Sequence, residues 1–84
     1  KTILDIGCGN GAFLKYLASV TSDLELQGID LSDVAEQEGN IIFLKGDFLT
    51  YQFLGKFDAV VTLAVIEHLR DVSSFAHQIH DLLN

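Results

Sequence analysis

The chain has 84 residues, 49% of them hydrophobic, and a formal net charge of −7 at pH 7. This length suits one small domain. No apolar run is long enough for a membrane span, and the acidic balance argues against nucleic-acid binding. The single cysteine, Cys8, excludes an internal disulfide and indicates a reducing compartment, so we expect a cytoplasmic protein.

The first stretch combines a strand, a glycine-rich turn and a helix. Thr2 to Ile6 is a short apolar run typical of a buried parallel strand, and Ala12 to Val20 carries a helical apolar stripe. Glycines allow a sharp reversal and let a ligand touch bare backbone, while the helix start offers free N–H donors. This order is typical of the first half of a nucleotide-binding βαβ unit. The turn glycines are Gly7, Gly9 and Gly11.

The spacing of the turn fits two kinds of ligand. Gly7, Gly9 and Ala12 satisfy the relaxed dinucleotide fingerprint. With Asp5 before them, the three glycines instead resemble motif I of the class I S-adenosylmethionine-dependent methyltransferases, whose usual form is Asp-x-Gly-x-Gly-x-Gly. A dinucleotide fold normally has an apolar residue at the position of Asp5. Since a buried carboxylate needs hydrogen bonds, we expect Asp5 to find a partner in the turn or in the ligand.

The second strand is predicted from Leu24 to Ile29 and ends at Asp30. Asp30 lies 19 positions after Gly11, where an acid that binds both ribose hydroxyls is expected. The alternative role is that of an acid near a helix N-terminus, and both roles can coexist. Leu31, the next residue, is assigned to the same cofactor site.

A short helix of two turns is predicted from Ser32 to Glu38, followed by a stop at Gly39 and Asn40. The methyltransferases that the chain resembles usually carry a longer helix at this point. The next apolar run, Ile41 to Leu44, is of strand type.

The third strand is followed by Gly46-Asp47-Phe48, which resembles the adenine-contacting motif of the same family. The resemblance implies that Asp47 accepts a hydrogen bond from the adenine amino group. It also implies that Phe48 offers backbone and apolar contact. Alternatively, these residues form a plain Gly-Asp turn with a core phenylalanine.

The rest of the chain is predicted to be a loop, a fourth strand and a helix. Leu49 to Lys56 is too short for a full crossover helix, Phe57 to Leu63 is a β-branched, apolar strand, and Ser73 to Leu83 is the last helix. Asp58 enters the fourth strand away from the ligand edge and is interpreted as structural. Leu63 leaves it beside the glycine turn and is assigned to the cofactor site.

Three right-handed crossovers predict the strand order 3-2-1-4 in an α/β, Rossmann-like, doubly wound parallel sheet. The assigned residues then lie at one rim, at the C-terminal ends of the strands. The family usually continues into a fifth strand. We therefore expect residues 1–84 to be the S-adenosylmethionine-binding part of a methyltransferase domain, truncated before that strand.

The methyl group of S-adenosylmethionine is already activated, so transfer to an acceptor, which the resemblance implies is a small molecule, needs mainly positioning. A dedicated catalytic side chain is not required. His68 is a candidate for a base, and the alternative is a polar turn before the last helix. No metal site is expected, because His77 and His80 have no further ligand in reach. Cys8 is interpreted as a small filler in the turn.

Two other functions stay open. An NAD-dependent oxidoreductase fragment would use Gly7, Gly9, Ala12 and Asp30 but leave Asp5 and Asp47 unexplained. A non-catalytic remnant would bind a nucleoside or a partner without turnover.

Overall fold

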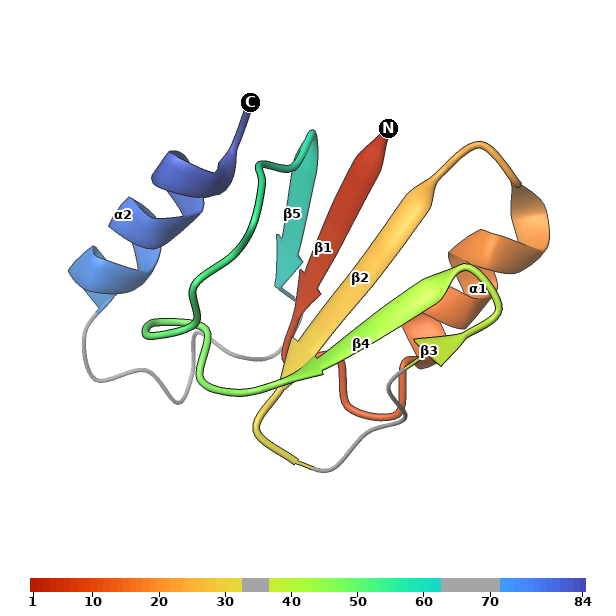
Figure 1. The fold of residues 1–84 in the computed structure, drawn as a ribbon, viewed down its shortest axis with the longest axis horizontal. Coiled ribbons are helices and arrows are strands. Elements are labelled where there is room, and N and C mark those ends of the chain that lie inside the picture. Colours follow the sequence, from red (N-terminus) through yellow and green to blue (C-terminus); the bar gives the residue numbers. More distant parts are fainter. Residues whose placement is uncertain (33–36, 63–71) are drawn as a thin grey trace.

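The computed structural model describes residues 1–32, 37–62 and 72–84 and shows one mixed sheet with a helix on each face (Figure 1). The elements in chain order are β1 (Thr2–Ile6), α1 (Ala12–Val20), β2 (Glu25–Asp30), β3 (Gln37–Glu38), β4 (Ile41–Lys45), β5 (Ala59–Thr62) and α2 (Val72–Leu82). Neither described helix is long and apolar enough to cross a membrane.

The strand order is β3-β4-β2-β1-β5. The strands β1, β2, β4 and β5 are parallel, while the two-residue β3 runs antiparallel along the outer edge of β4. Because β4 and β5 are the third and fourth parallel strands, the predicted order 3-2-1-4 is confirmed. Ile6 is in register with Ile29 on one side and Thr62 on the other, which aligns three strand ends at one edge.

Two apolar layers hold the helices against opposite faces of the sheet. On one face, Leu14 of α1 packs with Leu26 and Phe43. On the other face, Phe75 and Leu82 of α2 pack with sheet residues and with aromatic residues of the segment between β4 and β5. The alternation of side chains along each strand creates both layers, so the doubly wound architecture is confirmed.

Gly28 in β2 allows α1 to lie close to the sheet. A Cβ atom at this position would lie 2.7 Å from Cys8 Sγ and 2.8 Å from Leu14 Cδ1. Both atoms are buried in the layer under α1. A side chain at Gly28 would therefore push the helix and the preceding turn away from the strand.

The predicted helix from Ser32 to Glu38 is wrong at its C-terminal end. Gln37 and Glu38 are extended and pair with Ile42 and Ile41 of β4. Gly39, with φ of +59°, forms a hairpin turn between β3 and β4 rather than a helix stop. So short a segment gains little from helix formation, whereas the free edge of β4 offers hydrogen-bonding groups. Residues 33–36 lie outside the described residues.

The fourth parallel strand is shorter than predicted. Regular pairing covers Ala59–Thr62, while Phe57 forms an isolated bridge with Leu83, and its N–H donates to the Leu82 carbonyl at 2.7 Å. Leu63 lies outside the described residues. The start of this segment therefore ties the end of α2 to the sheet.

Asp58 joins three parts of the chain at the edge opposite the glycine turn. Its Oδ2 accepts a hydrogen bond from the Thr2 N–H at 2.8 Å, and its Oδ1 accepts one from Asn84 Nδ2 at 2.9 Å. These hydrogen bonds hold the pKa of Asp58 below its usual range. The structural role predicted for Asp58 is confirmed.

We predict that Asp58→Ala lowers the thermal unfolding midpoint by several degrees at pH 7, because two hydrogen bonds between distant segments are lost. The pKa of this carboxyl is lower in the folded state, so its contribution is present above the unfolded pKa and disappears as the pH falls through the folded pKa. Circular dichroism melts at pH 7 and below pH 4 should show the difference shrinking in acid. Asp23→Ala, at an exposed site, is the matched control. An equal loss for both variants would contradict the prediction.

Candidate functional site

The turn between β1 and α1 is built from left-handed glycines. Gly7, Gly9 and Gly11 have φ values of 72°, 57° and 80°, a region that other residues rarely adopt. The N–H groups of Gly7 and Cys8 donate to the Ile29 carbonyl at 2.8 and 3.2 Å, which fixes the turn to the end of β2. The predicted glycine turn is therefore formed, and its three glycines are required by backbone conformation.

The turn leaves open space at one glycine and not at another. A Cβ atom at Gly9 would meet nothing within 4 Å, whereas one at Gly11 would lie 2.5 Å from the ring of Phe43. Gly11 is thus packed against the sheet, and Gly9 is where a ligand can approach the backbone.

Asp30 lies across the turn at the end of β2. Its Oδ2 accepts the Gly9 N–H at 2.8 Å, and its Oδ1 accepts the Ser32 N–H at 2.9 Å and the Ser32 hydroxyl at 2.6 Å. Burial by itself would raise the pKa of Asp30, but hydrogen bonds from Ser32, Gly9 and Leu31 outweigh it and lower the pKa. Asp30 is therefore an ionised, oriented carboxylate, and Oδ2 retains a lone pair for a further donor.

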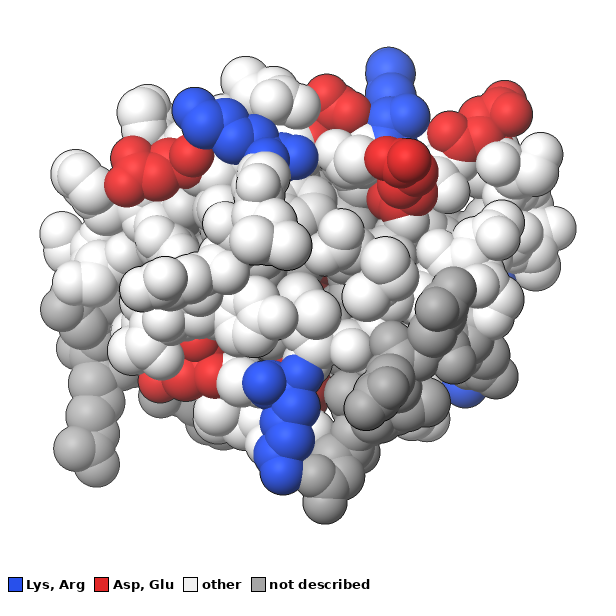
Figure 2. Space-filling view, viewed as in Figure 1, with Lys and Arg blue, Asp and Glu red and all other residues white. Residues whose placement is uncertain are grey.

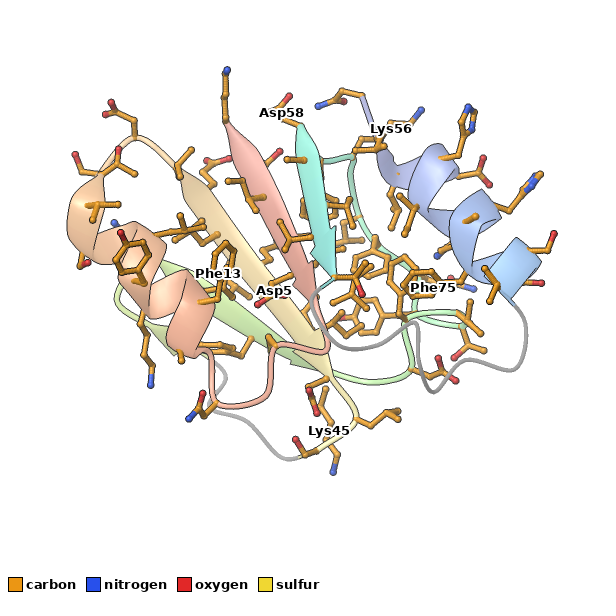
Figure 3. All side chains as sticks on the ribbon, turned by 180° about the vertical axis from the view of Figure 1, so that it is seen from behind. Asp5, Phe13, Lys45, Lys56, Asp58 and Phe75 are labelled. Atoms are coloured by element: carbon orange, nitrogen blue, oxygen red, sulfur yellow. The ribbon has the colours of Figure 1, made fainter. Side chains whose placement is uncertain are left out.

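Asp5 is the buried acid of β1, with only 3% of its surface exposed (Figure 3). Among the described residues, none donates a hydrogen bond to its carboxylate, so the expected partner is absent from the turn. Burial, followed by the negative charge of Asp30, raises the pKa of Asp5 to about 6. The site therefore contains one ionised acid and one acid that titrates near neutrality.

We predict that Asp5→Asn raises the free energy of unfolding of the ligand-free protein by about 1–2 kcal/mol at pH 7.5. The pKa of Asp5 is about 6 in the folded protein, compared with 3.8 in the unfolded chain. The carboxyl therefore destabilises the fold increasingly as the pH rises between these two pKa values, and its full effect is reached above the folded pKa. Urea denaturation at pH 4 and pH 7.5 measures the effect, with Asp23→Asn as the control. A variant less stable than the parent at pH 7.5 would refute it.

Two neighbours complete this part of the edge. Leu31 is 71% exposed beside the Asp30 carboxylate and offers an apolar surface to a ligand. Cys8 is buried, and its burial together with the charges of Asp30 and Asp5 raises its pKa to about 11. The thiol is therefore protonated at neutral pH, which agrees with its interpretation as a filler.

Asp47 and Phe48 follow β4 at the same edge but contribute in different ways. The Gly46 N–H donates to the Asp30 carbonyl at 2.9 Å, which brings the ends of β2 and β4 together. Asp47 is exposed, and its Oδ1 accepts the Leu49 N–H at 2.9 Å in a tight turn. Phe48 is only 6% exposed and packs 5.1 Å from Phe75 between ring centroids, so only its backbone is available to a ligand.

Thr62 is a residue at this edge that sequence reasoning missed. Its Oγ1 is buried and has no hydrogen-bond partner in the described part of the chain, and its neighbour in β1 is Ile6, directly before the glycine turn. The sequence does contain a sign of this position, because Thr62 is a polar residue at the end of an otherwise apolar strand. Leu63, Glu67 and His68, which the sequence placed after it, lie outside the described residues.

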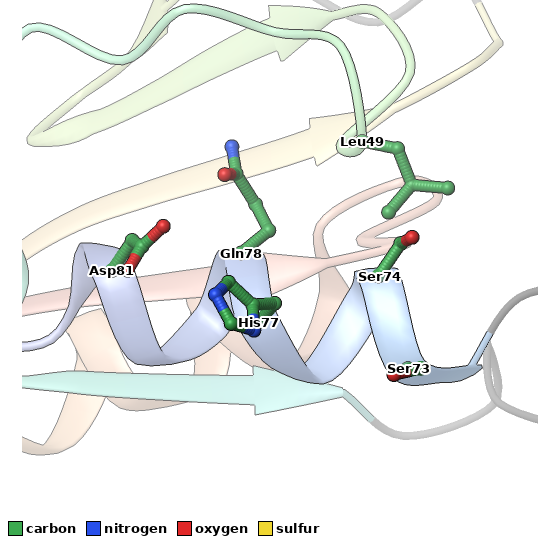
Figure 4. A pocket seen from close by; sticks show the side chains of 6 residues that line it. All are labelled: Leu49, Ser73, Ser74, His77, Gln78 and Asp81. Atoms are coloured by element: carbon green, nitrogen blue, oxygen red, sulfur yellow. The ribbon is translucent and has the colours of Figure 1, made fainter.

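The exposed histidines of α2 lie elsewhere. His77 borders a polar hollow of about 470 Å³ along α2 (Figure 4). His80 Nδ1 lies 3.8 Å from Asp81 Oδ1 on the exposed surface. Within residues 1–32, 37–62 and 72–84, no three potential metal ligands gather.

A parallel sheet with a glycine turn after its first strand and an acid after its second defines a Rossmann-like, nucleotide-binding class of domain. Known proteins share this arrangement. A structure of the plantazolicin methyltransferase BpumL in complex with SAH superimposes with a TM-score of 0.89 at 22% identity, covering 99% of this chain and 35% of that one. SAM-bound CalS10, an amino pentose methyltransferase from Micromonospora echinaspora, gives 0.77 at 25% identity, covering 99% and 38%.

Sequence relatives point to the same class. The putative methyltransferase 235L of Invertebrate iridescent virus 6 is 28% identical, covering 99% of this chain and 33% of its own length. The ubiquinone biosynthesis O-methyltransferase of Thiobacillus denitrificans is 29% identical, covering 88% and 36%. The family model described as "Methyltransferase domain" matches residues 1–84, so the chain belongs to this methyltransferase family. It spans about a third of the length of these relatives.

Proposed function

We propose that the protein is an S-adenosylmethionine-dependent methyltransferase and that residues 1–84 supply its cofactor-binding part. The observation that carries this proposal is the hydrogen bond from Gly9 to Asp30, which places an ionised acid beside open backbone. The family match and the relatives named above support it. A cytoplasmic location is part of the proposal and follows from the lone cysteine.

The residues present suit such a cofactor. Asp30 retains acceptor capacity for ribose hydroxyls, and Leu31 offers an adjoining apolar surface. Asp47 is exposed for an amino group of the base, while Gly9 leaves its part of the turn open to a ligand. The buried, negatively charged form of Asp5 favours positive charge nearby, such as a sulfonium or an ammonium group. When bound, the cofactor supplies an activated methyl group.

The acceptor is proposed to be a small molecule. Among the relatives, one is named for ubiquinone biosynthesis, and one from Papaver bracteatum is a probable (S)-tetrahydroprotoberberine N-methyltransferase. In a direct displacement, the protein mainly orients the acceptor and excludes water. Leu63 is proposed to line the cofactor site from the end of the fourth strand.

Titration calorimetry with S-adenosylhomocysteine, and with NADH as the comparator, tests the proposal. We predict selective binding of S-adenosylhomocysteine and about 10-fold to 100-fold weaker binding by Asp30→Asn, because the amide lacks the charge and one acceptor for ribose. Asp23→Asn serves as the exposed control. Preference for NADH would contradict the proposed cofactor, and a folded protein that binds neither ligand would favour a non-catalytic remnant.

His68 is the candidate base in this proposal. If catalysis depends on positioning alone, His68→Gln should leave the turnover number within about threefold of the parent. If His68 removes a proton from the acceptor, the variant should lose about 100-fold or more and the pH–rate profile should lose its acidic limb. Turnover measured between pH 5 and pH 9 with an identified acceptor distinguishes the two.

A further inference from the structure

A second concave site lies on the α2 face of the sheet, away from the glycine turn. It is a cavity of about 230 Å³ between the sheet and the segment that links β4 to β5. Lys56, at its margin, lies at the same end of the molecule as Asp58 (Figure 3). Lys45 lies at the other end and is in register with Asp30, at the edge of the sheet that holds the glycine turn and is here called the cofactor edge (Figure 3). The cavity is therefore separate from the proposed cofactor site. Residues that line it include Gln27, Ile42, Tyr51, Phe53, Gly55 and Lys56.

The walls of this cavity are apolar and partly open to water. Ile42 is 42% exposed although it lies in the sheet, because a loop rather than a helix covers this face. Tyr51 and Phe53 pack against each other with ring centroids 4.8 Å apart and ring planes tilted by 55°, and both line the cavity. Figure 2 shows charged side chains around the margin of this face and an uncharged middle. An apolar group that enters the cavity would remove this surface from water.

Two polar groups at the cavity can bind an anion. Gln27 is a polar residue in a central parallel strand, where apolar residues are usual, and no described residue forms a hydrogen bond with its side chain. Lys56, at the margin of the cavity, is exposed and forms no ion pair with another described residue. A carboxylate could accept hydrogen bonds from both groups, and the bond from lysine would be charge-assisted.

We propose that this cavity binds a small aromatic carboxylate. The ring would lie against Ile42, Tyr51 and Phe53, and the carboxylate would meet Lys56 and the Gln27 amide. A volume of about 230 Å³ suits a ligand of about ten non-hydrogen atoms. This proposal does not depend on the methyltransferase activity, since none of its residues belongs to the cofactor edge.

Phenylacetate is a suitable probe, with neutral phenylacetamide as its matched control. In two-dimensional NMR spectra of the ¹⁵N-labelled protein, phenylacetate should shift the Gly55 amide and the Gln27 side-chain amide, with a dissociation constant of about 1 mM. Phenylacetamide should bind at least about fivefold more weakly, because it lacks the charge. A saturating amount of S-adenosylhomocysteine should leave these shifts unchanged, which separates this site from the cofactor site.

Three variants sharpen the test. Lys56→Gln should remove the preference for the acid over the amide, while Lys15→Gln on α1, which carries the same charge change on the opposite face, should retain it. Ile42→Ala should weaken both ligands by a similar factor, since it removes apolar surface from the cavity lining and leaves Lys56 and Gln27 in place.

Three results would overturn the proposal. One is the absence of shifts at Gly55 and Gln27 with excess phenylacetate. Another is equal binding by the Lys56→Gln and Lys15→Gln variants. The third is a change in the same signals with protein concentration alone, which would assign the cavity to a second copy of the chain.

Discussion

The hydrogen bond between the Gly9 N–H and the Asp30 carboxylate joins the two halves of the site. It connects a turn after β1 with the end of β2, and the hydrogen bonds from the Gly7 and Cys8 N–H groups to the Ile29 carbonyl connect the same two segments. Ser32 holds the other carboxylate oxygen. Because these contacts position both the glycine backbone and the acid, ligand binding at this edge depends on β1 and β2 being neighbours in register.

Asp5 shows a conflict between stability and function at the same edge. A carboxylate with 3% exposure, next to the charge of Asp30, favours its protonated form, so at neutral pH it destabilises the ligand-free fold. A cationic ligand beside Asp5 would offset this destabilisation of the fold. Unfavourable buried groups of this kind are expected at binding sites, since the ligand supplies the missing partner.

The two faces of the sheet differ in how completely they are covered. On one face, Gly28 allows α1 and Cys8 to pack directly on β2. On the other, α2 and the aromatic residues of the loop cover the region near β1, but Gln27 and Ile42 remain at an open cavity. The segment between β4 and β5 therefore contributes to both sites. Asp47, near its start, lies at the cofactor edge, and Lys56, near its end, lies at the cavity.

Local patterns in the sequence determined the parallel strands, both helices, the glycine turn and the position of Asp30, because side-chain periodicity, glycine conformation and crossover handedness act over short distances. Tertiary structure alone decided the rest. Gln37 and Glu38 became a strand because the edge of β4 was available, and the Phe48 ring entered the core because Phe75 lies above it. The pKa of Asp5 and the cavity at Gln27 likewise depend on neighbours distant in the chain, which no local pattern encodes.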